Sequence, residues 1–200
     1  ASDVTGVGTA RQALAACEYG GDKAIFGFGA PGPDTAVTNL VSNVGVVATD
    51  VTGVGTARNH LAACSYGDDK GIFGFGHTST EVSLTNLVSN SGVVASDTTG
   101  VGTVRNQLTA CEFGGDKGIF GYGLDASASP ATFSLTNLVS NVGVVATDVT
   151  GVGTTRYSLA ACGYGYDKGI FGYGSGPTAI TNLVTNVGVV GSDVTGVGTA

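Results

Sequence analysis

A seven-residue motif, Asp-x-Thr-Gly-Val-Gly-Thr, recurs along the chain and constrains the fold more than any other feature of the sequence. Successive copies are separated by 47, 47, 51 and 45 residues, and they begin at Asp3, Asp50, Asp97, Asp148 and Asp193. A fixed period of this size is typical of repeat architectures, in which each unit is one small supersecondary structure packed on its neighbours. The sequence therefore predicts a single repeat domain over residues 1–200, with units at 11–57, 58–104, 105–155 and 156–200 and a leading connector, 1–10, that is duplicated at 191–200.

Within each unit the pattern predicts four short strands. In the second unit, apolar runs at 61–66 and 72–75 flank a Gly-Asp-Asp-Lys turn, and runs at 83–90 and 93–95 flank a Ser-Gly turn. Four strands in about 45 residues is the size of one propeller blade, and strands that are apolar on both faces suit a blade that is covered on two sides. We therefore expect an all-β fold, a β-propeller of four-stranded antiparallel blades with four repeats of about 45–51 residues.

The first half of each unit resembles the kelch repeat. An Arg precedes a small-residue strand that contains Cys, a Gly-x-Asp-Lys turn follows, and an Ile-Phe-Gly-Phe/Tyr-Gly run closes the hairpin, at 11–29, 58–76, 105–123 and 156–174. The second half departs from kelch, because Thr-Asn-Leu-Val replaces the usual Tyr and Trp. The units are also similar to glycine-rich tandem repeats of uncharacterised viral and bacterial proteins. A propeller of the regulator-of-chromosome-condensation type and an open β-solenoid are the alternative architectures.

Charge and motif content exclude several functions. The chain has eight Lys and Arg against fifteen Asp and Glu, a net charge of −7, and every basic residue occupies a repeated position. This balance opposes nucleic-acid binding, and no apolar run approaches the ~20 residues that span a membrane. The repeated Asp, Lys and Arg are explained by turn chemistry and an Asp–Arg pair that braces each connector. With no catalytic motif, we expect no enzyme activity and no cofactor.

One cysteine per unit lies at the same position of the first strand: Cys17, Cys64, Cys111 and Cys162. Equivalent positions of neighbouring blades are too far apart for a disulfide, so we expect four free thiols that serve as small packing residues. A ring of thiolates around the axis would be the alternative, a soft-metal site, but Cys-x-x-Cys spacing and histidine partners are both missing. We therefore expect no metal.

The units differ mainly in two places, the loop between the second and third strands and the two residues after the repeated Arg. In an up-and-down sheet both places fall on one face of the disc, which is the candidate binding surface. We interpret the chain as a non-catalytic recognition module that presents this face to a glycan or protein, on a virion or cell surface. The alternative is a structural, self-assembling scaffold, with self-association through the duplicated termini. The candidate ligand-binding residues are Gln12, Asn59, His60, His77, Glu81, Asn106, Gln107, Asp125 and Tyr157.

Overall fold

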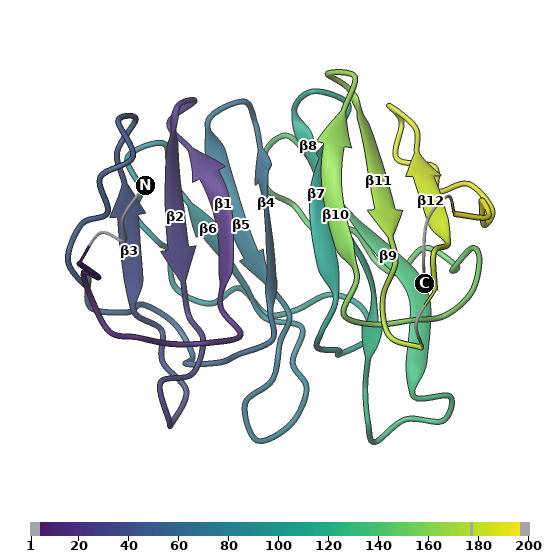
Figure 1. Ribbon diagram of the computed structural model, residues 1–200, viewed down its shortest axis with the longest axis horizontal. Coiled ribbons are helices and arrows are strands. Elements are labelled where there is room, and N and C mark those ends of the chain that lie inside the picture. The colour runs from purple at the N-terminus through teal and green to yellow at the C-terminus, as the bar shows by residue number, and fades with distance from the viewer. Residues whose placement is uncertain (1–4, 177, 197–200) are drawn as a thin grey trace.

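The computed structural model describes residues 5–176 and 178–196, which form four antiparallel sheets of three strands each (Figure 1). The all-β class and the fourfold repetition predicted from the sequence are therefore confirmed. Unit 1 contains β1 (Ala15–Tyr19), β2 (Lys23–Gly27) and β3 (Thr38–Val41), and unit 2 contains β4 (Ala62–Tyr66), β5 (Lys70–Gly74) and β6 (Thr85–Val88). Unit 3 contains β7 (Thr109–Phe113), β8 (Lys117–Leu124) and β9 (Thr132–Val139), and unit 4 contains β10 (Ala160–Tyr164), β11 (Lys168–Gly172) and β12 (Thr181–Val184).

Each sheet is a meander in which the first and second strands form a tight hairpin. In unit 1, Cys17 lies opposite Ile25, and the same register recurs in the other three units. The turn needs two residues at positive φ, and Gly20 and Gly21 take φ values of 63° and 76° at no steric cost. The Gly-x-Asp-Lys signature of the sequence thus marks the hairpin turn in every unit.

The prediction of a fourth strand in each unit is wrong. In unit 1 the fourth segment pairs with β3 only at two isolated positions, Thr38 with Val51 and Val41 with Val47. Between these pairs the fourth segment has one residue more than β3, so a regular ladder cannot form. The side chain of Asn39 occupies the irregular gap, where its Nδ2 donates a hydrogen bond to the Ala48 carbonyl oxygen at 3.1 Å. The other units repeat this arrangement.

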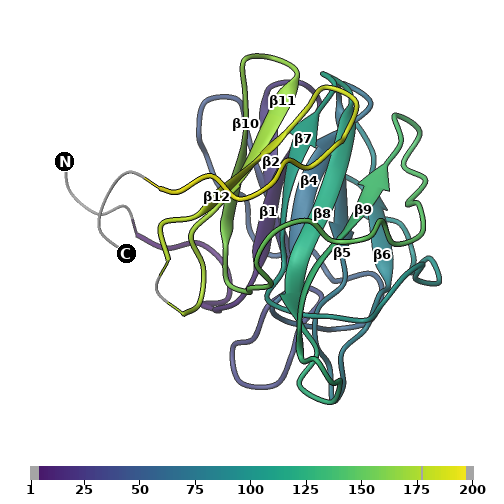
Figure 2. The ribbon, with the colours of Figure 1, turned by 90° about the vertical axis from the view of Figure 1, so that its right-hand side faces the viewer.

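The four sheets stand side by side in an open arc. The first strands β1, β4, β7 and β10 pack against one another in that order along the inner side of the arc, and the third strands lie outside (Figures 1 and 2). The described residues form no closed barrel or propeller, because units 1 and 4 occupy the two ends of the arc. Among those residues no helix is long and apolar enough to cross a membrane.

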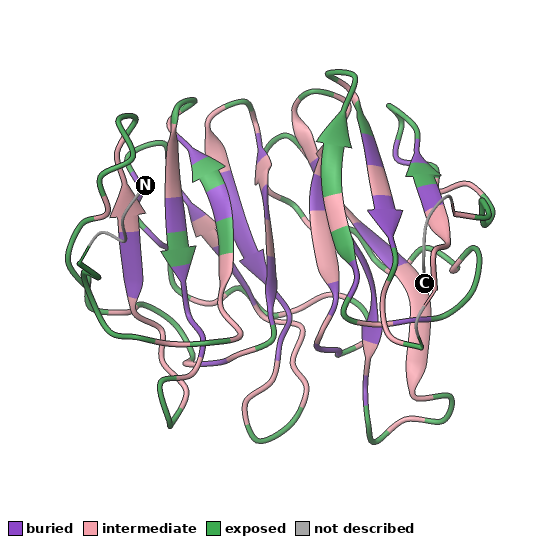
Figure 3. Ribbon diagram, in the orientation of Figure 1, coloured by how far each residue is buried: buried purple, intermediate pink, exposed green. Residues whose placement is uncertain are grey.

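The hydrophobic core is divided into layers between successive units (Figure 3). Between units 1 and 2, the rings of Phe28 and Phe73 meet edge to face at 5.2 Å, and both are fully buried. The Phe73 ring lies so close to Gly27 that a Cβ there would come within 2.6 Å of it. The same ring pair recurs between units 2 and 3 and between units 3 and 4. Each unit therefore completes its core only by packing on the next one.

Candidate functional site

The repeated charged residues form a clamp within each unit. In unit 2, Arg58 Nε donates to the Phe75 carbonyl oxygen at 2.8 Å and its Nη2 donates to Asn86 Oδ1 at 2.7 Å. Asn86 Nδ2 donates to Asp97 Oδ1 at 2.8 Å, and Asp97 in turn accepts hydrogen bonds from the backbone and hydroxyl of Thr56. Arg58 Nη1 lies 3.9 Å from Asp97 Oδ1. The clamp joins the connector that leads into the unit, the third strand and the last segment, so these residues have a structural role.

Burial and hydrogen bonding shift the acid–base properties of the clamp in both directions. Desolvation lowers the pKa of Arg58 to about 10, although the nearby Asp97 carboxylate opposes the shift. Desolvation raises the pKa of Asp97, but the hydrogen bonds from Thr56 and Asn86 and the charge of Arg58 outweigh it, and the net pKa lies below the usual value. The clamp therefore holds an arginine and an aspartate in their charged forms at neutral pH.

The two outer copies of the connector belong to different units. The hydroxyl of Thr9, in the first copy, donates to Asp50, whereas Asp193, in the last copy, accepts from Thr154. The first copy thus begins unit 1 and the last copy completes unit 4, at opposite ends of the arc (Figure 1). The two copies therefore occupy different positions in the fold. The parts of the duplication at 1–4 and 197–200 lie outside the described residues.

The two variable regions lie side by side on one face, which we call the loop face. It consists of the residues that follow each repeated Arg and of the segments at 30–37, 77–84, 124–135 and 175–180, except 177; in unit 3, residue 124 belongs to β8 and residues 132–135 to β9. Isolated bridges join the two regions: Gln12 pairs with Ala30, Asn59 with His77, and Asn106 with Leu124.

Two of these loops are tied to the following unit by a carboxylate and an amide. Asn59 Nδ2 donates to Asp34 Oδ1 at 2.6 Å, and Asn106 Nδ2 donates to Glu81 Oε1 at 3.1 Å. In both pairs the acid belongs to the loop of one unit and the asparagine to the next. The Oδ1 atoms of Asn59 and Asn106 are buried without a hydrogen-bond partner. Asp34 is not among the residues predicted from the sequence, although it follows its closing glycine by the same number of residues as Glu81.

The other residues predicted from the sequence differ in their burial and hydrogen bonding on the loop face. Asp125 is buried and accepts hydrogen bonds from the backbone and hydroxyl of Ser127, so it shapes its own loop and does not point outward. Gln107 accepts a hydrogen bond from the Ser158 hydroxyl at 2.8 Å. His60 and Gln12 are exposed, whereas His77 and Tyr157 are half-buried.

A backbone ladder crosses the units at the base of this face. The His60 N–H donates to the Ala13 carbonyl oxygen, Gln107 donates to His60, and Ser158 donates to Gln107. All four residues have φ between 50° and 54°, a left-handed conformation that is unusual outside glycine. The ladder fixes the spacing of the variable residues from unit to unit.

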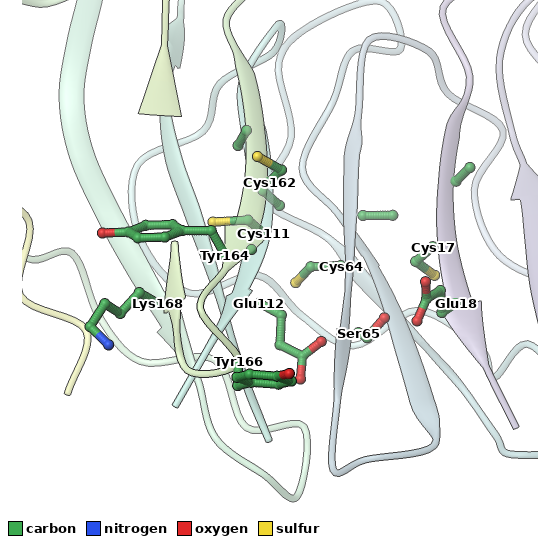
Figure 4. Close-up of a pocket in the computed structure, with 15 residues that line it drawn as sticks. Cys17, Glu18, Cys64, Ser65, Cys111, Glu112, Cys162, Tyr164, Tyr166 and Lys168 are labelled. Carbon is green, nitrogen blue, oxygen red and sulfur yellow. The ribbon is translucent and has the colours of Figure 1, made fainter. Parts of the chain in front are cut away.

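A hollow of about 420 Å³ lies on the inner side of the arc, against the first strands (Figure 4). Its acidic lining comes from Glu18 and Glu112, which occupy equivalent positions in units 1 and 3. Desolvation raises the pKa of Glu112, and repulsion from Glu18 and other carboxylates adds to this shift. Tyr164, Tyr166 and Lys168 line the hollow from unit 4.

The cysteines border the hollow, but three of their thiols pack between units. A Cβ on Gly71 would lie 2.5 Å from Cys17 Sγ, and the pairs Cys64–Gly118 and Cys111–Gly169 are equivalent. Desolvation raises the pKa of Cys17 to about 12. All four cysteines are free, but Cys162 is exposed, so the prediction of four packed thiols is wrong for unit 4. Unit 4 has no following unit to cover that thiol in the described chain.

Within the described ranges, no three His, Cys, Asp or Glu side chains gather closely enough to hold a metal ion.

No protein-family model matches the sequence, and no curated protein matches it at a significant level.

Proposed function

We propose that this protein is a non-catalytic recognition module of the β-propeller type, with kelch-like units, and that its loop face binds a hydroxyl-rich ligand such as a glycan. The observation that carries the proposal is the pair of ties, Asp34–Asn59 and Glu81–Asn106, which anchor loops of variable sequence to the neighbouring unit. Anchored loops on a rigid scaffold are the usual arrangement for recognition, because little conformational entropy is lost on binding.

The chemistry of the loop face supports a glycan. The loop of unit 2 carries His77, Thr78, Ser79, Thr80 and Glu81, which supply hydroxyl, imidazole and carboxylate groups. The buried Oδ1 atoms of Asn59 and Asn106 lack donors, and a ligand hydroxyl that reached them as the loops adjusted would provide one.

A glycan array tests this proposal. We expect the wild-type protein to bind a defined set of glycans and the variants Glu81→Ala and His77→Ala to bind them at least about tenfold more weakly. Ser91→Ala is a matched control, because Ser91 is exposed in the turn after β6, outside the loop face. Absence of glycan binding, or binding that Ser91→Ala weakens as much as Glu81→Ala does, would contradict the proposal. Capture of a protein ligand that is lost in Glu81→Ala would identify the loop face as a protein-binding surface instead.

A further inference from the structure

The two end faces of the arc expose residues that are buried at every internal junction between units. We call the exposed face of unit 1 the leading face and that of unit 4 the trailing face. On the leading face, Phe26 is 38% exposed, whereas its equivalents in units 2 to 4 are fully buried. On the trailing face, Tyr173 is 48% exposed, whereas its equivalents in units 1 to 3 are fully buried. The faces therefore carry the two halves of a junction that the chain forms three times internally.

The aromatic and arginine contacts of that junction have complete counterparts on the end faces. Internally, Phe73 covers Gly27 and meets Phe28, and the guanidinium of Arg58 lies 4.2 Å from the centre of the Phe28 ring. Unit 4 retains the receiving glycine and ring as Gly172 and Tyr173, and unit 1 retains the covering ring and arginine as Phe26 and Arg11.

The outer part of the junction is also retained. Internally, Gly92 of unit 2 lies so close to unit 1 that a Cβ there would come within 2.8 Å of Leu40 and 3.0 Å of Tyr19. The counterparts are Gly45 on the leading face and Tyr164 and Leu183 on the trailing face, and all three are exposed. An apolar groove of about 640 Å³ on the leading face is lined by Leu14, Phe26, Gly45 and neighbouring residues.

The backbone presents matching hydrogen-bond groups. At the internal junctions, the N–H of Gly29 donates to the Arg58 carbonyl oxygen and the N–H of Gly20 donates to the Asp69 carbonyl oxygen. The equivalent donors on the trailing face belong to Gly174 and Gly165. The equivalent acceptors on the leading face are the carbonyl oxygens of Arg11 and Asp22.

Both end sheets border the opening of the arc. In Figure 1 the end sheets flank the opening, with β1 and β10 toward its centre and β3 and β12 outward. Figure 2 places units 2 and 3 behind them. In a dimer with a two-fold axis parallel to the first strands, the leading face of each copy meets the trailing face of the other, and the one axis generates both contacts.

We propose that two copies of this chain join face to face, leading face on trailing face, and close a ring of eight three-stranded sheets. The occupant of each end face is thus a second copy, because the contact continues an interface that already exists within the chain. The hollow beside the first strands becomes a central channel lined by both copies. This assembly goes beyond the proposed recognition function and does not depend on it.

Residue 24 affects how closely the leading face packs on the trailing face. Ala24 stands where the other units have Gly71, Gly118 and Gly169, and at those glycines a Cβ would lie 2.5 to 2.7 Å from the cysteine Sγ of the preceding unit. In the ring, the thiol of Cys162 must therefore turn away from Ala24 of the other copy. We expect Ala24→Gly to lower the dissociation constant of the dimer.

Sedimentation velocity over a range of concentrations tests the ring. We expect the wild type to reach twice the 19.6 kDa mass of one chain, and no larger species. Phe26→Glu and Tyr173→Glu should each raise the dissociation constant at least about tenfold, because each places a charge in both junctions of the dimer. Val142→Glu is the control, since Val142 is exposed in the turn after β9 of unit 3, away from both end faces. Unchanged circular dichroism and thermal melting of the monomers would show that the variants remain folded.

A mixing experiment distinguishes this geometry from any other contact. Phe26→Glu keeps an intact trailing face, and Tyr173→Glu keeps an intact leading face. An equimolar mixture should therefore form a heterodimer through one unmodified junction, although each variant alone is monomeric. A wild-type protein that stays monomeric at high concentration would overturn the proposal. So would a dimer that survives both substitutions, an open polymer, or a mixture that does not associate.

Discussion

The guanidinium carbon of Arg58 lies 4.2 Å from the centre of the Phe28 ring, which belongs to the preceding unit. The same arginine donates hydrogen bonds to Phe75 and Asn86 in its own unit. One side chain therefore links the internal clamp of a unit to the aromatic contact between units. Arg105 and Arg156 do the same at the next two junctions.

Arg58→Lys should lower the free energy of unfolding by about 3 kcal/mol, because a lysine cannot donate in the same fork or stack on the ring. Arg11→Lys is the matched control, since Arg11 makes the same hydrogen bonds within unit 1 but, among the described residues, stacks on no aromatic ring. We expect its loss to be smaller by about 1–2 kcal/mol, the contribution of a desolvated cation–π contact. Urea unfolding of both variants in the Phe26→Glu background, which keeps the leading face free, gives the comparison. Equal losses would show that the stacking adds nothing.

Gly71→Ala should destabilise the protein by about 1–3 kcal/mol through overpacking, because the new Cβ would lie 2.5 Å from Cys17 Sγ. Adding Cys17→Ala removes the sulfur, so the two substitutions together should cost less than the sum of their separate effects. Thermal or urea unfolding of the single and double variants measures this coupling. A neutral effect of Gly71→Ala would mean that the junction is looser than the structure indicates.

The repeat and its turn signatures predicted the sheets because their determinants are local. The Gly-x-Asp-Lys turn and the strands on either side of it lie within one stretch of chain, so the first hairpin of every unit follows from the sequence. The absence of a regular fourth strand could not be predicted in this way, because it depends on the hydrogen bond that the Asn39 side chain donates to Ala48 of the fourth segment. Apolar character alone does not reveal that competition.

In the candidate site, too, the local contacts were predictable from the sequence and the contacts between units were not. The grouping of Gln12 with Ala30 and of Asn59 with His77 follows from the meander topology, and the structure has both contacts. The sequence predicted Asn59, Glu81 and Asn106 as site residues, but it did not predict the hydrogen bonds that join loops to the next unit. Asp34 and Asn59, for example, are distant in sequence and meet only through packing between units. The open ends of the arc were not predictable from the repeats, since each unit has nearly the same sequence whether or not a neighbour covers it.

We expect one of the four cysteine thiols to react fast with a thiol reagent and the other three to react slowly. Desolvation raises the pKa of Cys17 and Cys111 to about 12 and raises that of Cys64 as well. Very little of these three thiols is therefore ionised at pH 8, and a maleimide should react mainly with the exposed Cys162. Mass spectrometry of the Phe26→Glu variant should show one rapid addition, which Cys162→Ser removes, and four additions in guanidinium. Rapid modification of Cys17 in the folded protein would contradict this packing.

Acid should weaken the clamp of each unit. The hydrogen bonds from Thr56 and Asn86 hold the net pKa of Asp97 below its usual value of 3.8, against the opposing effect of desolvation. Because the folded-state pKa is depressed, the stabilisation is present above pH 3.8 and is lost as the pH falls through the lower folded-state value. Urea unfolding should therefore show a fall in stability below about pH 4. Asp97→Asn should be less stable at pH 7, by about 1–3 kcal/mol, and should depend less on pH. An unchanged pH dependence would contradict this role.

Glu112→Gln should have the opposite effect. Desolvation, with repulsion from Glu18 and Asp68, raises the folded-state pKa of Glu112, so the ionised side chain opposes folding at neutral pH and the protonated one does not. Removing the charge should raise the free energy of unfolding at pH 7 by about 0.5 kcal/mol, a modest value because solvent screens this half-buried group. At pH 3 the substitution should be nearly neutral, since Glu112 is then protonated in both states. Urea unfolding at the two pH values measures the difference, with Glu18→Gln as a comparison at the equivalent position of unit 1. A loss of stability at pH 7 would show that the Glu112 carboxylate makes a favourable contact in the hollow.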